Sequence, residues 1–230
     1  MLAAQSADPI DRSRAIESIA AAYWKPVYKY TRMKRQISPD DAADFTQEFF
    51  TRLLEKDFLD GYDSSKGRLR TFLRTCADRL FLNQMRDANR IKRGAGLSHL
   101  SLDFTEAENE LASIAASTAA SESPEDLFDK EWVRSLFSLG LQKLRANCAA
   151  DGKAIHLHIF ERYDLADEDT VPSYAQLATE FNLSATDVTN YLAFARREFR
   201  RCVLEQLRDM TASDEEFRCE AQALLGVDAP

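Results

Sequence analysis

Glycine and proline are scarce in this chain, which has seven glycines and six prolines in 230 residues. No glycine occurs between residues 97 and 139, or between residues 153 and 225. Tight turns in β folds depend on glycine, and both residues interrupt helices, so their scarcity favours helix over turn-rich β structure. The sequence therefore predicts an all-α protein, and its length allows two small domains.

Long apolar runs are also lacking. No window approaches the ~20 apolar residues that a membrane-spanning helix needs. The first twelve residues lack the basic patch and the following apolar run of a secretory signal. We therefore expect a cytoplasmic protein without a membrane contact.

Cysteine pairs and catalytic motifs are missing as well. The four cysteines are far apart and form no C-x-x-C pair, so neither a zinc cluster nor a disulfide framework is predicted. No nucleophile elbow, H-E-x-x-H, Walker A or dinucleotide-binding pattern occurs. We expect no metal, no cofactor and no catalytic residue, hence a protein that is not an enzyme.

Charge is unevenly distributed along the chain. The formal net charge of -8 disfavours a protein that coats nucleic acid on its own. Residues 1–98 nevertheless hold 18 Lys/Arg against 13 Asp/Glu, residues 99–170 hold 6 against 15, and residues 171–230 hold 6 against 10. A basic first part is thus followed by an acidic middle.

The first part predicts three helices. Apolar residues recur at helical spacing over 11–35, and Pro26 is expected either to kink this helix or to split it. Ser38 and Pro39 are a typical helix start, and the helix that follows has phenylalanines on one side and acids on the other. After a loop over 57–67, a third helix over 68–93 is rich in arginine. Its arginines suit phosphates and its aromatic residues suit unpaired bases, although a solvated basic face over a core explains the same pattern.

The second part begins after a segment without helical periodicity. Residues 97–124 are rich in small and acidic residues and are predicted to be a flexible linker, after a first domain over 1–96. Helices are expected from Ser123–Pro124, over 154–163, over 173–181 and from Ser184 to 208. We predict a second domain over 125–210 and an amphipathic tail over 211–230.

The pair of helices around residues 182–183 has helix-turn-helix spacing. Small and apolar residues on both helices allow them to cross near a right angle, which leaves the start of the second helix free for a major groove. A plain helical hairpin is the alternative. His156, His158 and Glu161 suggest a metal site, but residues two apart on a helix point ~200° away from one another and cannot share one ion.

The order of these segments resembles the extracytoplasmic-function group of bacterial sigma factors, in the sigma-70 family. Residues 39–54 resemble the region 2 helix that docks on the polymerase β′ clamp, although Ala43 stands where an acid is usual. The tract from Tyr23 to Lys56 also resembles a planctomycete-type branch of this group. The core-polymerase-binding residues that the resemblance implies are Asp41, Asp44, Phe45, Gln47, Glu48, Phe49 and Arg52.

Residues 67–86 resemble the segment that melts and captures the minus-ten promoter strand, with Phe72 where tryptophan is usual. The acidic linker would, by this resemblance, pass through the RNA exit path. The minus-ten DNA-binding residues that the resemblance implies are Tyr62, Ser64, Ser65, Lys66, Arg68, Arg70, Arg74, Arg79, Asn83 and Arg86.

The C-terminal half resembles sigma region 4, which contacts the minus-thirty-five element. Thr189, Tyr191 and Phe194 replace usual basic residues, and Asp187 adds a negative charge. The minus-thirty-five DNA-binding residues that the resemblance implies are Tyr174, Ser184, Thr186, Asp187, Thr189, Asn190, Arg196, Arg197 and Arg200.

The resemblance implies an RNA polymerase sigma factor with two small helical domains, a region 2 bundle and a region 4 helix-turn-helix. Its expected partners are the β′ clamp and β flap of core polymerase, promoter DNA including the melted minus-ten strand, and an anti-sigma factor or other regulator. Two alternatives stay open. One is a helix-turn-helix regulator that does not bind polymerase, and the other is a helical-bundle enzyme with a site around His156, His158, Glu161 and Tyr163.

Overall fold

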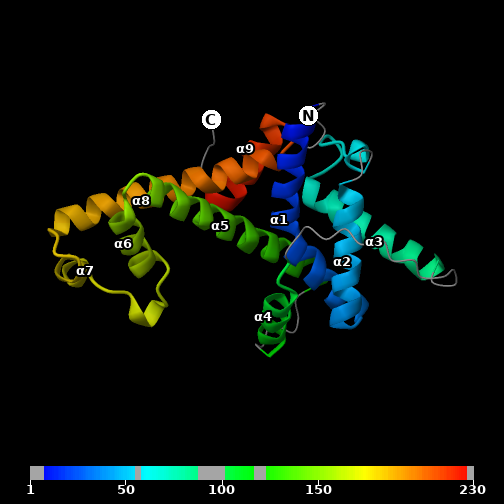
Figure 1. The fold of residues 1–230 in the computed structure, drawn as a ribbon, viewed down its shortest axis with the longest axis horizontal. Helices are drawn as coiled ribbons and strands as arrows, with labels where there is room; N and C mark the ends of the chain where they lie inside the picture. Colours follow the sequence, from blue (N-terminus) through cyan, green and yellow to red (C-terminus); the bar gives the residue numbers. More distant parts are fainter. Residues whose placement is uncertain (1–7, 55–57, 88–101, 117–122, 227–230) are drawn as a thin grey trace. The chain divides into compact units, whose positions relative to one another are not determined.

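The structure is a computed structural model that describes residues 8–54, 58–87, 102–116 and 123–226 (Figure 1). Every regular element in these ranges is a helix, so the predicted all-α fold is confirmed. No helix in the described ranges is both long enough and apolar enough to cross a membrane. The predicted end of the basic helix at 88–93 and the predicted domain boundary at 96 lie outside the described residues.

Helix α1 (Pro9–Arg35) is the centre of the first part of the chain. Asp8 accepts a hydrogen bond from the backbone N–H of Ile10 at its start, and Gln36 ends it in a left-handed conformation with φ 52°. Pro26 lies inside this single helix. Helices α2 (Pro39–Leu53) and α3 (Leu69–Asp87) pack beside it, as Figure 1 shows. The short 3-10 helix η2 (Leu59–Gly61) lies between α2 and α3 in the chain.

Helix α4 (Phe104–Ala116) lies within the segment predicted as a flexible linker. It forms because Asp103 caps it, accepting a hydrogen bond from the N–H of Glu106, and because its apolar side finds aromatic partners on α1. Phe104 packs edge-on against Trp24 with ring centroids 5.6 Å apart, and against Tyr28 at 5.2 Å. The sequence does carry a signal for this helix, because Phe104, Ala107, Leu111 and Ile114 recur three or four residues apart.

The start of α5 and both ends of α6, α7 and α8 agree with the predicted positions to within two residues. Ser123 caps α5 by accepting a hydrogen bond from the N–H of Asp126. The bounds are α5 (Pro124–Ala150), α6 (Ala154–Asp164), the 3-10 helix η3 (Glu168–Thr170), α7 (Tyr174–Glu180), α8 (Ala185–Asp209) and α9 (Asp214–Leu225).

The chain forms two compact units, one made of residues 1–135 with 208–230 and the other of residues 136–207. Their limits fall inside α5 and α8, whereas the sequence pattern puts limits at 96, 124 and 210. The predicted limits were placed in segments between expected helices. The long helices α5 and α8, however, each contribute residues to both units. The predicted functional division of the chain stays a prediction.

The unit of residues 136–207 has two apolar clusters. One contains Leu144, Phe160 and Cys202, and the other contains Ile159, Leu177 and Leu192. Helices α5 and α8 approach closely at Gly140, where an added Cβ would lie 2.5 Å from a methyl carbon of Val203. Only a glycine leaves room for that methyl group.

Candidate polymerase and nucleic-acid interface

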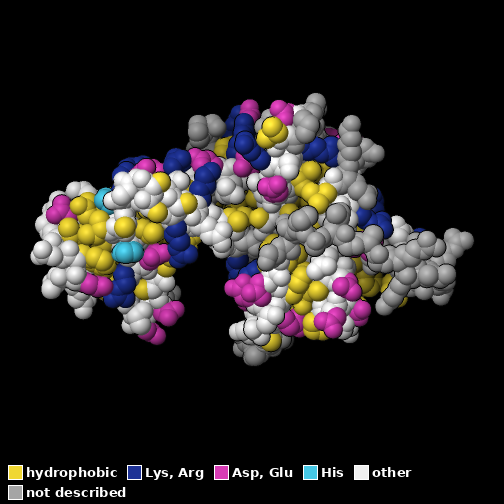
Figure 2. All heavy atoms as spheres, viewed as in Figure 1, with side chains coloured by type: hydrophobic (Ala, Val, Ile, Leu, Met, Phe, Trp, Pro, Cys, Tyr) yellow, Lys and Arg dark blue, Asp and Glu magenta, His cyan; other side chains and the backbone are white. Residues whose placement is uncertain are grey.

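The outer face of α2 carries the acids that were predicted to bind polymerase. Asp41, Asp44 and Gln47 are exposed, and so is Arg52 at the end of the helix. Figure 2 shows acidic side chains gathered over α2 and α4. The structure thus places these four predicted residues on one accessible helix, where a positively charged partner surface can reach Asp41 and Asp44.

Phe45 and Phe49, from the same predicted set, lie in the core. They are 3% and 0% exposed. Phe45 packs edge-on against Phe81 of α3 at 5.8 Å, and Phe49 packs against Phe58 at 5.6 Å. Phe45 therefore holds α2 against α3, Phe49 packs against the segment that follows α2, and the exposed residues of α2 are the ones available to a partner.

Glu48 is half-buried and has partners within the chain. One carboxylate oxygen accepts a hydrogen bond from Arg52 at 2.6 Å, and the other accepts one from the side-chain amide of Gln84 at 2.6 Å. The second bond joins α2 to α3. Glu48 therefore has a role in packing in addition to any contact with a partner.

The loop before α3 is organised by Asp63. Its carboxylate accepts hydrogen bonds from the backbone N–H and the hydroxyl of Ser65, at 3.0 and 2.7 Å, and pairs with Lys66 at 3.1 Å. These bonds lower the pKa of Asp63 below its usual value. Ser65 and Lys66 stay exposed and Ser64 is half-exposed, so the loop has a fixed backbone with accessible polar side chains.

The predicted minus-ten residues divide into two groups. Arg79, Asn83 and Arg86 are exposed along the later turns of α3, and Arg74 is half-buried. Tyr62 is only 6% exposed, and Arg70 is half-buried with its guanidinium 4.8 Å from the centre of the Trp132 ring. Arg68 is exposed but forms an ion pair with Glu220. The second group therefore has partners inside the same unit.

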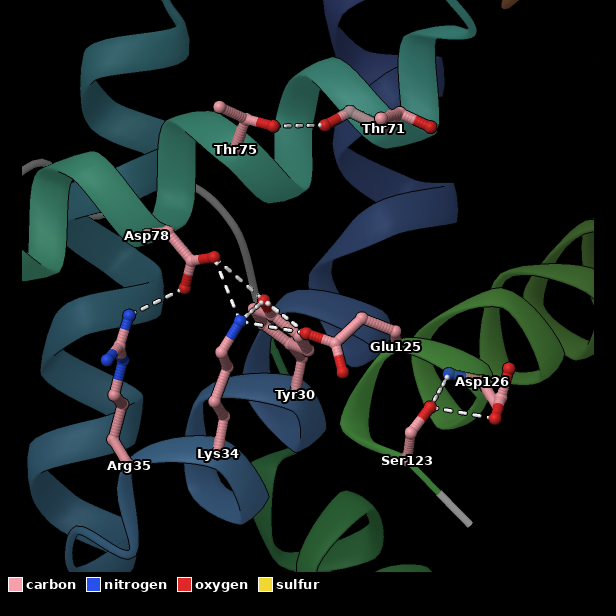
Figure 3. Close-up of polar contacts among 9 residues, drawn as sticks. All are labelled: Tyr30, Lys34, Arg35, Thr71, Thr75, Asp78, Ser123, Glu125 and Asp126. Carbon is pink, nitrogen blue, oxygen red and sulfur yellow. Dashed lines mark hydrogen bonds and ion pairs between the residues drawn. The ribbon is translucent and has the colours of Figure 1, made fainter.

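Asp78 joins α3 to the basic end of α1 (Figure 3). Its carboxylate accepts hydrogen bonds from Lys34 at 3.0 Å, Arg35 at 2.7 Å and the hydroxyl of Tyr30 at 2.9 Å. Lys34 also pairs with Glu125 of α5 at 2.8 Å. Burial alone would raise the pKa of Asp78, but the Lys34 and Tyr30 hydrogen bonds and the nearby positive charges lower it. These contacts fix the orientation of α3 relative to α1. Lys34 and Arg35 of α1 are therefore engaged within the fold.

The acids of α4 are directed at α1. Glu110 pairs with Lys25 at 2.9 Å and with Lys29 at 2.5 Å, and Glu108 bonds Arg32. The Arg32 hydrogen bond lowers the pKa of Glu108 below its usual value. Composition indicated an acidic segment but gave no sign of these partners, which are about 80 residues away in sequence.

Helices α7 and α8 are joined by a short, well-defined turn. Ser173 and Gln176 form a reciprocal capping box at the start of α7. Asn182 has φ 53°, a left-handed conformation that asparagine tolerates. Ser184 and Asp187 exchange hydrogen bonds at the start of α8, and these bonds lower the pKa of Asp187. The carboxylate of Asp187 is therefore used as a helix cap.

The first turns of α8 present Thr186, Thr189 and Asn190 to solvent. Arg196 donates three hydrogen bonds to Asp164 of α6, the shortest of 2.7 Å, and these raise its pKa. Of the other predicted minus-thirty-five residues, Tyr174 packs edge-on against Tyr163, while Arg197 and Arg200 are exposed.

Tyr191 and Phe194 pack around a histidine. His156 stacks on Tyr191 with centroids 3.9 Å apart and meets Phe194 edge-on at 5.1 Å. Burial, and then the charge of Lys153, lower the pKa of His156. The histidine side chains of this unit lie apart in Figure 2, and the described residues contain no group of three His, Cys, Asp or Glu that could hold a metal ion.

Residues 19–91 match the family model of Sigma-70 region 2. This segment is about a third of the chain and covers most of α1, all of α2 and all of α3. Searches of curated proteins and of solved structures found no match for the chain. This segment of the chain is therefore similar to Sigma-70 region 2.

Proposed function

We propose that the chain is a non-catalytic specificity subunit of bacterial RNA polymerase, a sigma factor of the extracytoplasmic-function group in its planctomycete-type branch. The observation that carries the proposal is the coincidence of the Sigma-70 region 2 match with α2 and α3. Within the matched segment, α2 exposes acids for a partner and α3 exposes Arg79 and Arg86 for phosphates.

In this proposal the exposed face of α2 binds the β′ clamp of core polymerase, and the loop before α3 holds the melted minus-ten strand with α3. Helices α7 and α8 form the region 4 helix-turn-helix, which contacts the β flap and the minus-thirty-five element. The exposed side chains of Thr186 and Asn190 at the start of α8 support a reading role, because that part of a second helix enters the major groove. An anti-sigma factor that covers the face of α2 is a further expected partner.

Co-purification with bacterial core polymerase tests the proposal. Wild type is expected to bind core, whereas Asp44→Arg should weaken binding at least tenfold, since a like charge at a rim contact costs about 1.4 kcal/mol or more. Asp169→Arg is the matched control because it makes the same charge change at an exposed position of the other unit. Glu48 is avoided because its partners lie within the chain.

The alternative of a regulator that does not bind polymerase is favoured by one observation only, the α7–α8 pair with its exposed first turns. If wild type fails to bind core but still shifts double-stranded DNA, this alternative replaces the proposal. Equal binding of core by wild type and Asp44→Arg would overturn the role given to α2.

A further inference from the structure

Helix α9 belongs to the unit that contains α1, α2 and α3. Ser213 caps its start by accepting a hydrogen bond from the N–H of Glu216, and Gly226 ends it with φ 61°. Phe217 and Ala221 are buried on its inner face, with Ala221 fully covered. The helix is therefore packed into this unit by an apolar face, although neither its sequence nor the match over 19–91 links it to region 2.

Glu216 of α9 contacts the loop before α3 and the start of that helix. The hydroxyl of Tyr62 donates a hydrogen bond of 2.7 Å to one carboxylate oxygen, and the backbone N–H of Leu69 donates one of 3.3 Å to the same oxygen. Burial and then this hydrogen bond raise the pKa of Tyr62. An anion from α9 thus occupies the N-terminus of α3, where a phosphate would also be stabilised.

Glu220, one turn further along, contacts the arginines of the same region. It lies 3.3 Å from Arg68 and 3.2 Å from Arg70. Tyr62, Arg68 and Arg70 are all members of the set predicted to bind the minus-ten strand. The two carboxylates of α9 therefore bind a hydroxyl, a backbone N–H and two guanidinium groups, all of which are donors that could bind phosphate oxygens instead.

The contact of Glu220 with the start of α3 stabilises the docked α9 only weakly. Glu220 is 4% exposed, and its Oε2 atom has no hydrogen-bond partner among the described residues although Arg70 is within ion-pair distance. Burial raises the pKa of Glu220 above its usual value. A buried carboxylate that is paired but incompletely hydrogen-bonded repays little of its desolvation cost. The helix is thus held by contacts that a competing polyanion can replace.

We propose that α9 is an internal competitor of the promoter strand, whose Glu216 and Glu220 occupy the phosphate-binding groups at the start of α3 until single-stranded DNA displaces the helix. The inference rests on the proposed function, because it gives that region the strand-binding role. It adds a regulatory step to that function: strand binding requires α9 to leave.

The first experiment compares Ala221→Asp with Ala223→Asp in the full chain. Residue 221 is buried and residue 223 is exposed on the same helix, so an identical change undocks α9 in one variant only. The probe is a fluorescently labelled, random-sequence single-stranded DNA. If about a tenth of wild type is undocked, Ala221→Asp should bind the probe about tenfold more tightly than wild type, and Ala223→Asp should match wild type. The added negative charge by itself would weaken binding.

The second experiment needs no variant. Hydrogen exchange of residues 214–225 in wild type should become faster when the DNA probe saturates the protein, because displaced α9 loses its packing. Unchanged or greater protection, or equal or weaker DNA binding by Ala221→Asp, would overturn the competitor role. Binding to core polymerase is measured in parallel. If either of these results is found while wild type still binds core polymerase, only the competitor role of α9 fails. If wild type binds neither core polymerase nor DNA, the proposed function is overturned as well.

Discussion

Lys29 is a cation in the interior of the first unit. It is 1% exposed, and its ammonium group pairs with Glu110 of α4 at 2.5 Å and with Glu131 of α5 at 2.8 Å. Glu131 is itself 2% exposed. Both ions lose their hydration on folding, so their mutual contacts are needed to offset that cost. One lysine thereby makes the packing of three helices interdependent.

We expect Glu131→Gln to lower the free energy of unfolding by about 3 kcal/mol, because it leaves a buried cation with one anionic partner. The control is Glu106→Gln, which removes an exposed partner of Lys25 and should cost less than about 1 kcal/mol. Urea unfolding measures both. Equal losses in the two variants would show that Lys29 is not stabilised by its buried partner.

At the scale of elements, sequence reasoning succeeded where the signal is local. Ser38, Ser123 and Ser184 each stand three residues before an aspartate whose N–H they bind, and the predicted helix starts are correct there. The positions of α4 and α9 could not be predicted in this way, because their partners are far away along the chain. Glu216, for example, meets Tyr62 at a separation of 154 residues.

The same limit applies to the candidate site. Exposed Asp41 and Asp44 could be assigned from the helical stripe alone. The burial of Tyr62 and the pairing of Arg196 with Asp164 depend on which elements pack together. A basic residue that matches a motif is therefore only a weak prediction of a phosphate contact, because acids that the fold brings near compete for it.

The docking of α4 on α1 should depend on pH. Glu108 and Glu110 have a usual pKa of 4.5, and both values are lowered in the fold. For Glu108 the main cause is the Arg32 hydrogen bond; for Glu110, burial opposes the shift but Lys29 and Lys25 outweigh it. The unfolded chain binds these protons first, so the stabilisation is present above pH ~4.5 and is lost as the pH falls through the lowered values.

Melting temperatures measured by circular dichroism from neutral pH to pH ~3 test this dependence. The wild type should exceed Glu108→Gln/Glu110→Gln at neutral pH, and the difference should shrink in acid. Asp78 and Glu125 also have lowered pKa values, but they titrate in both proteins and cancel in the comparison. A difference that stays constant with pH would mean that the ion pairs of α4 add no stability.

At the scale of the whole molecule, the compact unit around α1 includes residues up to 135, whereas the sequence pattern predicts a domain limit at 96. Tyr23 and Tyr30 of α1 are 2% exposed because α5 covers them. Tyr23 stacks on Trp132 with centroids 6.1 Å apart, and Tyr30 meets Phe128 edge-on at 5.6 Å. The first turns of α5 are therefore part of the core around α1.

A fragment of residues 1–96 should accordingly be less stable than a fragment of residues 1–135. Full burial of an aromatic side chain contributes about 1.5 to 3 kcal/mol, so the loss of Phe128 and Trp132 together removes several kcal/mol of a small domain's stability. The longer fragment also retains Glu125 and Glu131 as partners of Lys34 and Lys29. Thermal unfolding of both fragments, with the full chain as reference, measures the difference. If residues 1–96 melt as cooperatively and at the same temperature as residues 1–135, the boundary at 96 is the physical one, and α5 only covers a domain that is already complete.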